Sequence, residues 1–151
     1  MKFTVDIDIL ASREKVIQIY MDRKHFNDWR FTAVDEKVLA GEPGRVGASI
    51  QLTRKIGNQV ETVIETLESN SLPDDLTYTI SAPQLWQRSR NSFIQSAPNK
   101  TTWIMENDFK CAGIHKVISL LAPGRFRKQS LQEMQRFKRF CEDKVYSEVV
   151  F

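Results

Sequence analysis

The chain has 151 residues, of which 27% are charged and 41% hydrophobic, and this composition is typical of one globular domain. Three Trp, three Tyr and nine Phe supply large apolar side chains for a core and argue against a disordered chain. The net charge of +3 is small, and no aromatic stacking platform accompanies a basic stripe, so we expect no nucleic-acid partner.

Targeting and redox signals are also weak. The N-terminus alternates polar and apolar residues where a signal peptide needs an unbroken apolar run, and no stretch is long enough to span a bilayer. We therefore expect a cytoplasmic protein with no membrane span. Cys111 and Cys141 are too far apart in the sequence for a zinc motif and stand in apolar contexts, which favours buried free thiols.

The first thirty residues predict one strand and two short helices. Residues 2–10 alternate in the pattern of a half-buried strand, with one face formed by Phe3, Val5, Ile7 and Ile9. Ser12 is the expected N-cap of a first helix, and Asp22 the cap of a second. In that second helix Phe26 and Trp29 are three residues apart and share a face.

Residues 32 to 110 read as a series of strands joined by short turns, which predicts antiparallel pairing. Val34 and Val38 indicate one strand, and a glycine-rich loop over 41–47 follows it. Later strands are expected at 59–69, 76–81, 86–96 and 102–109, with turn signals at 57–58, 72–75 and 98–99. Neither face of the 86–96 strand is plainly apolar, so it either carries a bulge or lines a wet pocket.

The last forty residues are helical in pattern. Residues 113–122 predict a short helix or an irregular apolar segment, and Pro123-Gly124 then interrupts the chain. A long helix is expected from about 125 to 145, because apolar residues recur at spacings of three and four. Its stripe consists of Phe126, Ser130, Leu131, Met134, Phe137, Cys141 and Val145.

Three stretches carry a family likeness. They are the second short helix with its closing Trp over 22–29, the glycine-rich loop over 41–48, and the strand, proline turn and strand over 67–78. With the order of elements, they make the chain resemble the START-like superfamily, also called SRPBCC, which includes polyketide cyclase/dehydrase-like proteins. The likeness implies an α+β helix-grip fold, in which a seven-stranded curved antiparallel sheet wraps around a long C-terminal helix. Residues 1–146 would form the single domain, and 147–151 a short C-terminal tail.

The resemblance implies an internal cavity between the sheet and the C-terminal helix, and hence a carrier or sensor of a small hydrophobic molecule such as a lipid, a polyketide-like compound or an aromatic compound. Strand and helix faces then predict the ligand-binding residues. They are Tyr78, Asn91, Phe93, Trp103, Met105, Asn107, Phe109, Leu131, Met134 and Phe137. The alternative is a packed core in which Asn107 is satisfied by backbone or water.

An enzyme of the cyclase/dehydratase type is a second hypothesis, and whether the chain is an enzyme stays open. It needs a base in the cavity, and the candidates are Glu36 and Tyr78. A carboxylate on an inward face would have a raised pKa through desolvation. In the alternative, Glu36 points outward at a bulge or pairs with a Lys or Arg.

A third hypothesis is a protein-interaction module, with a homodimer as one form of it. The contact surface would be the tail at 149–151 or the apolar segment 114–121, which could instead form a lid, touch a membrane or lie buried beneath the helix start. We expect neither a metal nor a cofactor, since the acidic residues are scattered and His25 and His115 are interpreted as surface or helix-end residues.

Overall fold

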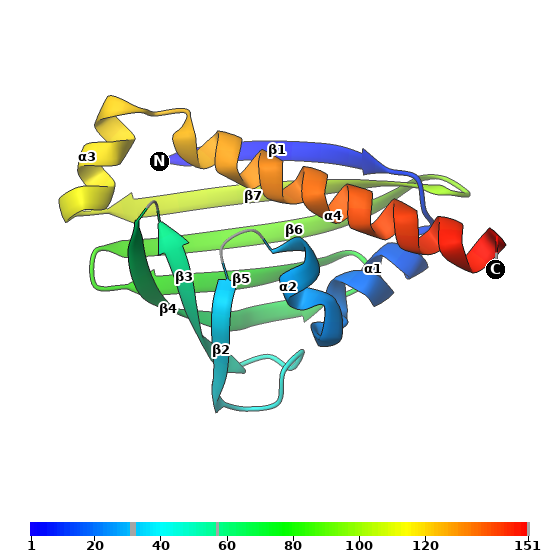
Figure 1. Cartoon of the computed structure of the whole chain (residues 1–151), viewed down its shortest axis with the longest axis horizontal. Helices are drawn as coiled ribbons and strands as arrows, with labels where there is room; N and C mark the ends of the chain where they lie inside the picture. Colours follow the sequence, from blue (N-terminus) through cyan, green and yellow to red (C-terminus); the bar gives the residue numbers. More distant parts are fainter. Residues whose placement is uncertain (31–32, 57, 151) are drawn as a thin grey trace.

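The computed structural model describes residues 1–30, 33–56 and 58–150. Its strands form one seven-stranded antiparallel sheet in the order β1-β7-β6-β5-β4-β3-β2 (Figure 1). The strands are β1 (Lys2–Ile9), β2 (Ala33–Ala40), β3 (Ser49–Ile56), β4 (Gln59–Ser71), β5 (Asp75–Ala82), β6 (Leu85–Ala97) and β7 (Lys100–Cys111). The predicted turn at Gly57 lies outside the described residues.

Short helices connect β1 to β2. They are α1 (Arg13–Met21), the 3₁₀ turn η1 (Arg23–His25) and α2 (Phe26–Trp29). Both predicted caps are confirmed, since the Ser12 hydroxyl accepts from the backbone N–H of Lys15 and the Asp22 carboxylate accepts from that of Lys24. These caps fix the path that carries Trp29 into the interior, where it is 1% exposed.

Two helices follow the sheet. The short helix α3 (Gly113–Leu121) begins at a glycine with a φ of +58°, a conformation that residues with a Cβ seldom adopt. The long helix α4 (Arg125–Val150) then crosses the sheet, with α3 beyond one end of it and α1 near the other (Figure 1).

The helix α4 ends five residues later than the sequence predicted, at Val150 instead of about 145. No glycine or proline stops it after residue 124. Its last turns are held by an ion pair of 2.6 Å between Lys15 and Glu148, and the Ser147 hydroxyl donates to the Asp143 carbonyl. Most of the segment interpreted as a tail is therefore helical.

The inward face of the sheet follows the strand alternation. On β7, the buried residues are Thr101, Trp103, Met105, Asn107 and Phe109. On β6, the face that points inward carries Ser89, Asn91 and Phe93, whereas Arg88 and Arg90 lie exposed on the other face. The uneven pattern on β6 thus reflects an interior that is itself partly polar.

Aromatic rings fill one end of the interior. The ring centroid of Tyr20 lies 5.4 to 5.7 Å from four others, which belong to Trp29, Phe93, Trp103 and Phe137. Most of these pairs are edge-to-face or tilted, the arrangement that ring quadrupoles favour. Met134 and Cys141 of α4 extend this core, and burial raises the pKa of the Cys141 thiol to about 12.

The apolar stripe of α4 has two parts, one packed in the core and one facing the cavity. Met134, Phe137 and Cys141 are fully buried and pack against the aromatic core. Phe126 and Ser130, nearer the start of the helix, instead face open space in the interior. The helix-grip fold predicted from the sequence is confirmed, and its interior is filled at one end only.

Replacing Phe137 with Ala should test the aromatic core. We expect the free energy of unfolding to fall by about 3–5 kcal/mol, because the side chain is 0% exposed and touches three other rings. Tyr146→Ala, on an exposed part of the same helix (68% exposed), is the matched control and should change it by less than about 0.5 kcal/mol. Denaturant unfolding measures both, and equal losses would contradict this description of the core.

Candidate functional site

A cavity of about 130 Å³ lies between the sheet and the first turns of α4. One part of its wall is apolar and is formed by Leu52, Val63, Ile80, Leu85, Met105, Phe109 and Phe126. The other part is polar and is formed by Tyr20, Arg30, Arg54, Glu65, Tyr78, Gln87, Ser89, Asn91, His115, Arg125, Gln129, Ser130 and Glu133. The space therefore suits a molecule with one apolar and one polar side.

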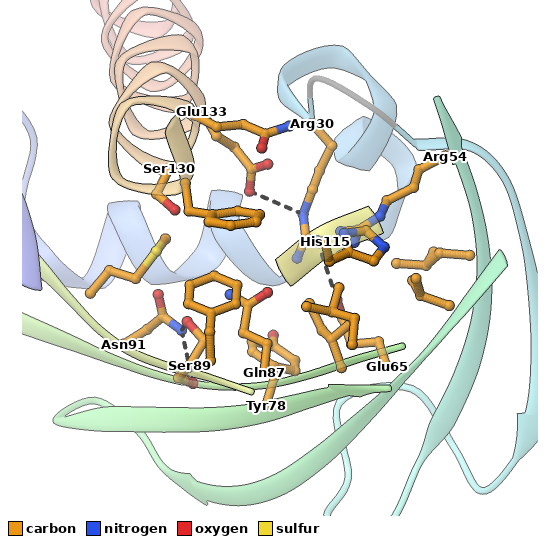
Figure 2. Close-up of a pocket in the computed structure, with 18 of the residues that line it drawn as sticks. Arg30, Arg54, Glu65, Tyr78, Gln87, Ser89, Asn91, His115, Ser130 and Glu133 are labelled. Carbon is orange, nitrogen blue, oxygen red and sulfur yellow. Dashed lines mark hydrogen bonds and ion pairs between the residues drawn. The ribbon is translucent and has the colours of Figure 1, made fainter. Parts of the chain in front are cut away.

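An ion cluster of one buried and two half-buried side chains dominates the polar part. Arg30, directly after α2, reaches into the cavity between Glu133 on α4 and Glu65 on β4 (Figure 2). Its Nη1 donates to Glu65 Oε2 at 3.2 Å, and its Nε lies 3.7 Å from Glu133 Oε1. The Arg30 side chain also stacks over the rings of Phe26 and Trp29, so the guanidinium is fixed in position.

The cluster changes the acidity of its members. Burial would lower the pKa of Arg30, but the Glu65 and Glu133 carboxylates outweigh it and raise that pKa. Arg30 is therefore a permanent cation. Burial raises the pKa of Glu133, with Arg30 opposing the shift, so this carboxyl takes up a proton more readily than an exposed one.

Two tyrosines lie beside the ion cluster. Burial, with the Glu65 carboxylate as a second cause, raises the pKa of Tyr78 to about 12. Burial also raises the pKa of Tyr20 well above its usual value. Both phenols therefore keep their protons at neutral pH and are able to donate hydrogen bonds.

A row of amide and hydroxyl groups crosses the floor of the cavity on β6 and β7. Trp103 Nε1 donates to Asn91 Oδ1 at 2.9 Å, and Asn91 Nδ2 lies 3.3 Å from the Ser89 hydroxyl. Gln87 Nε2 donates to Asn107 Oδ1 at 3.0 Å. Asn107 Nδ2 and Arg30 Nε are buried without a hydrogen-bond partner among the described residues. Of these two residues, Arg30 lines the cavity, and its Nε lies 3.7 Å from Glu133 Oε1.

A smaller cavity of about 50 Å³ adjoins the first. The glycine-rich loop reaches it through Pro43 and Gly44, and the two cavities share four lining residues. Those four residues are Tyr20, Arg30, Glu65 and Tyr78. The ion cluster and the two phenols therefore stand between the compartments as a polar partition.

Helix α3 reaches the cavity through His115. His115 is in the first turn of α3, so its expected place at a helix end is confirmed. It is 6% exposed, so the expected surface position is wrong. His115 Nε2 lies 2.6 Å from Glu61 Oε1, and Arg54 holds the same carboxylate at 3.0 Å. This pairing joins α3 to the β3–β4 hairpin.

The predicted ligand-binding residues fall into two groups. Tyr78, Asn91, Met105 and Phe109 line the cavity. Phe93, Trp103, Met134 and Phe137 lie in the packed core instead, because the rings of Tyr20 and Trp29 occupy the space in front of them. Asn107 is buried behind Gln87, and Leu131 is half-buried on α4 without lining the cavity.

Glu36 lies on edge strand β2, outside the lining of the cavity. Its Oε2 accepts from Arg23 Nη2 at 2.5 Å, which matches the alternative of pairing with an arginine. The carboxylates that do line the cavity are Glu65 and Glu133.

Sequence reasoning missed Tyr20, Arg30, Glu65 and Glu133. Two of these had a readable signal. Glu65 shares an alternating inward face with Val63 and Leu67 on β4, and Glu133 follows Ser130 by three positions at the edge of the helix stripe. Both signals conflict with the general rule that charged residues are exposed.

Within the described ranges, no group of three or more His, Cys, Asp or Glu side chains is arranged to hold a metal ion. Among the helices of the same ranges, none combines the length and apolar character that crossing a membrane requires.

No family model and no curated protein matches the sequence. Solved structures do match over nearly the whole chain. A conserved protein from Geobacillus kaustophilus superposes with a TM-score of 0.80 at 11% identity, covering 95% of this chain and 96% of the other. The Zhui aromatase/cyclase from a Streptomyces species gives 0.79 at 12% identity, with 96% and 95% covered. A START superfamily protein from Mycobacterium smegmatis gives 0.71 at 17%, with 97% of each chain covered. The chain therefore has the START-like helix-grip fold.

The raised pKa of Glu133 predicts a pH dependence of stability. Between the ordinary pKa of a glutamate and the raised one, the folded chain binds more protons than the unfolded chain, so the wild type loses stability as pH rises through this window. Glu133→Gln lacks this loss. We expect the stability of the variant relative to wild type to rise as the pH increases above about 4, the ordinary range of a glutamate pKa.

Urea unfolding at a series of pH values measures this difference. Asp143→Asn, at an exposed position of the same helix, is the control and should follow the wild-type curve. Parallel curves for wild type and Glu133→Gln would show that burial does not perturb this carboxyl.

Proposed function

We propose that the chain binds a small, mostly apolar molecule with at least one oxygen-bearing polar group, in the cavity between the sheet and α4. The observation that carries this proposal is a partly apolar cavity whose wall holds the guanidinium of Arg30, with its Nε buried and without a hydrogen-bond partner among the described residues. Glu65 and Glu133 balance the charge of Arg30, but a buried N–H group without an acceptor still costs free energy, and a ligand oxygen would remove that cost.

The size of the cavity supports a ligand of about one ring. A cavity of about 150 Å³ in a protein interior is known to admit benzene. The larger cavity here has about 130 Å³ and the adjoining one about 50 Å³. A long-chain lipid would exceed this space, so we narrow the expected ligand to a compact aromatic or cyclic compound.

The polar groups support an orientation for that ligand. Its ring would lie against Met105, Phe109 and Phe126. Its oxygen would accept from the Tyr78 hydroxyl or from Arg30 Nε, which has no hydrogen-bond partner among the described residues. Recognition would then depend on a few directed donors and on apolar contact, as in most small-molecule sites.

Structures of similar fold give consistent support. One neighbour is described as an aromatase/cyclase, and another is a norcoclaurine synthase in complex with dopamine and hydroxybenzaldehyde, at 9% identity and a TM-score of 0.71. Those compounds belong to those proteins. They are aromatic and oxygenated, which is the chemical class that the cavity wall favours here.

A carrier or sensor requires only this binding. Catalysis is the second candidate, and the observation that favours it is the raised pKa of Glu133 beside Arg30. A carboxyl with a raised pKa is a stronger base than an exposed one, and a fixed guanidinium would stabilise an enolate formed next to it. Glu133, rather than Glu36, would then be the base of an enzyme acting on an enolisable aryl ketone.

Binding can be tested with 4-hydroxybenzaldehyde, benzene and decanoic acid as probes, followed by calorimetry. We expect 4-hydroxybenzaldehyde to bind tightest and decanoic acid weakest, because the first matches both the size and the polarity of the cavity. Native mass spectrometry of gently purified protein, compared with its denatured mass, would also reveal a ligand that co-purifies.

A cavity-filling pair of variants provides the control. Val63→Phe places a ring in the cavity from a residue that is 1% exposed, whereas Ile64→Phe places it on the outer face of the same strand, at 40% exposure. We expect Val63→Phe to weaken binding by at least about tenfold, and Ile64→Phe to leave it unchanged. Equal affinities of the two variants, or no binding of either ring compound, would disprove the proposal.

Catalysis has its own test, in which an enolisable aryl ketone is assayed for proton exchange by NMR. Glu133→Gln should lower the exchange rate by about 10²–10⁴-fold while changing ligand affinity little. Glu36→Gln is the matched control and should keep the wild-type rate, because Glu36 pairs with Arg23 outside the cavity. Exchange at the wild-type rate in Glu133→Gln would remove Glu133 from the mechanism and leave the binding function.

A further inference from the structure

Helix α3 presents an apolar surface to solvent. Its exposed side chains are Ile114 at 55%, Val117 at 48%, Leu120 at 72% and Leu121 at 81%. The same helix directs His115 inward to Glu61, which fixes which face points outward. Four large apolar side chains on a helix of nine residues form a concentrated patch for a surface element. We call these four residues the α3 patch.

The sequence that contains and flanks the α3 patch carries only positive charges. From Phe109 to Leu131 the sequence has no Asp or Glu, whereas it has five basic residues. They are Lys110, Lys116, Arg125, Arg127 and Lys128, and all are exposed. Since the whole chain has a net charge of +3, the rest of the chain carries a net charge of −2. The positive charge is therefore concentrated at the end of the molecule that bears the patch.

The patch is also held in place. The pairing of His115 with Glu61 attaches α3 to the sheet, and the backbone N–H of Ala112 donates to the Gln84 carbonyl before the helix begins. Helix α3 lies beyond one end of α4, where neither α1 nor α2 covers it (Figure 1). A rigid apolar surface at an extremity of the molecule is able to meet a flat partner without rearrangement.

We propose that the α3 patch is a docking surface for a lipid bilayer with anionic headgroups. Apolar aliphatic side chains with exposed Lys and Arg on both sides in the sequence, and no acidic residue between Phe109 and Leu131, match an anionic interface. The aliphatic groups would enter the acyl boundary and the cations would meet lipid phosphates. A second copy of the chain is disfavoured, because symmetric pairing would bring two such basic regions together. A protein partner is less well matched, since the patch lacks the Trp and Tyr anchors that dominate protein interfaces.

This surface does not depend on the cavity having a ligand. It would nevertheless bring the cavity close to the membrane, because His115 of α3 and Arg125 of the next helix both line it. The membrane would then be one source of the compact apolar ligand, and the proposed binding function does not itself specify where that ligand comes from.

The experiment is co-sedimentation of the full chain with vesicles of phosphatidylcholine alone, or of phosphatidylcholine with about one-third phosphatidylglycerol. We expect binding to the anionic vesicles only, and weaker binding as salt is raised from about 0.1 M to about 0.5 M. Leu120→Ser with Leu121→Ser should lower the partition coefficient by at least about tenfold, and Lys116→Glu with Lys128→Glu should do the same.

The matched control is Leu10→Ser with Val149→Ser. These residues are 61% and 81% exposed, close to the exposures of Leu120 and Leu121, but they lie in the β1–α1 connection and the last turns of α4. The control should bind vesicles like the wild type, and circular dichroism should show all variants folded. The proposal is overturned if the wild type fails to bind anionic vesicles, or if the Leu120/Leu121 variant binds them as well as the control does. It is also overturned if sedimentation velocity shows that the variant loses self-association while its vesicle binding is unchanged.

Discussion

The packing of Tyr20 against four other aromatic rings decides how the interior is divided. A curved sheet closed by one helix encloses more volume than the inward side chains of either can fill. Here α1 and α2 deliver Tyr20 and Trp29 into one half of that volume, where they meet Phe137 and close it. At the first turns of α4, Phe126 stacks on Phe109 of the sheet instead, and the cavity lies beside this pair. The position of the cavity is therefore determined by α1 and α2, because their side chains fill the opposite end of the interior.

The same path of the chain brings a charge inside. Arg30 follows Trp29 directly, so burying the indole carries the guanidinium into the wall of the cavity. Its charge is matched by one carboxylate from the sheet and one from α4, Glu65 and Glu133. Replacing such a cluster with apolar residues often leaves stability unchanged or improves it, so stability does not explain its presence. A cluster of this kind instead holds three charges at defined positions where a ligand would lie.

Much of the fold was readable in the sequence, because strand alternation, helix caps and turn residues are local signals. The cavity was less readable. The expected lining included Phe93 and Phe137, since both lie on inward faces, but an inward face does not reveal what stands in front of it. Glu65 could have been found from its alternation with buried neighbours on β4. Arg30 could not, because its direction depends on how α2 docks against α4, a contact between residues about a hundred positions apart.

The partition between the two cavities has a consequence for selectivity. Its members include Arg30 and Glu65, which lie 3.2 Å apart and line both spaces. An elongated molecule entering the larger space would reach this ion pair before it reached the smaller one. To extend further it would have to separate two charges in a region poor in water, a step far more costly than moving an apolar side chain aside. For the proposed ligand, this ion pair would be an electrostatic barrier that limits how far a bound molecule can extend, and a substitution that removed the two charges would allow a longer molecule to bind.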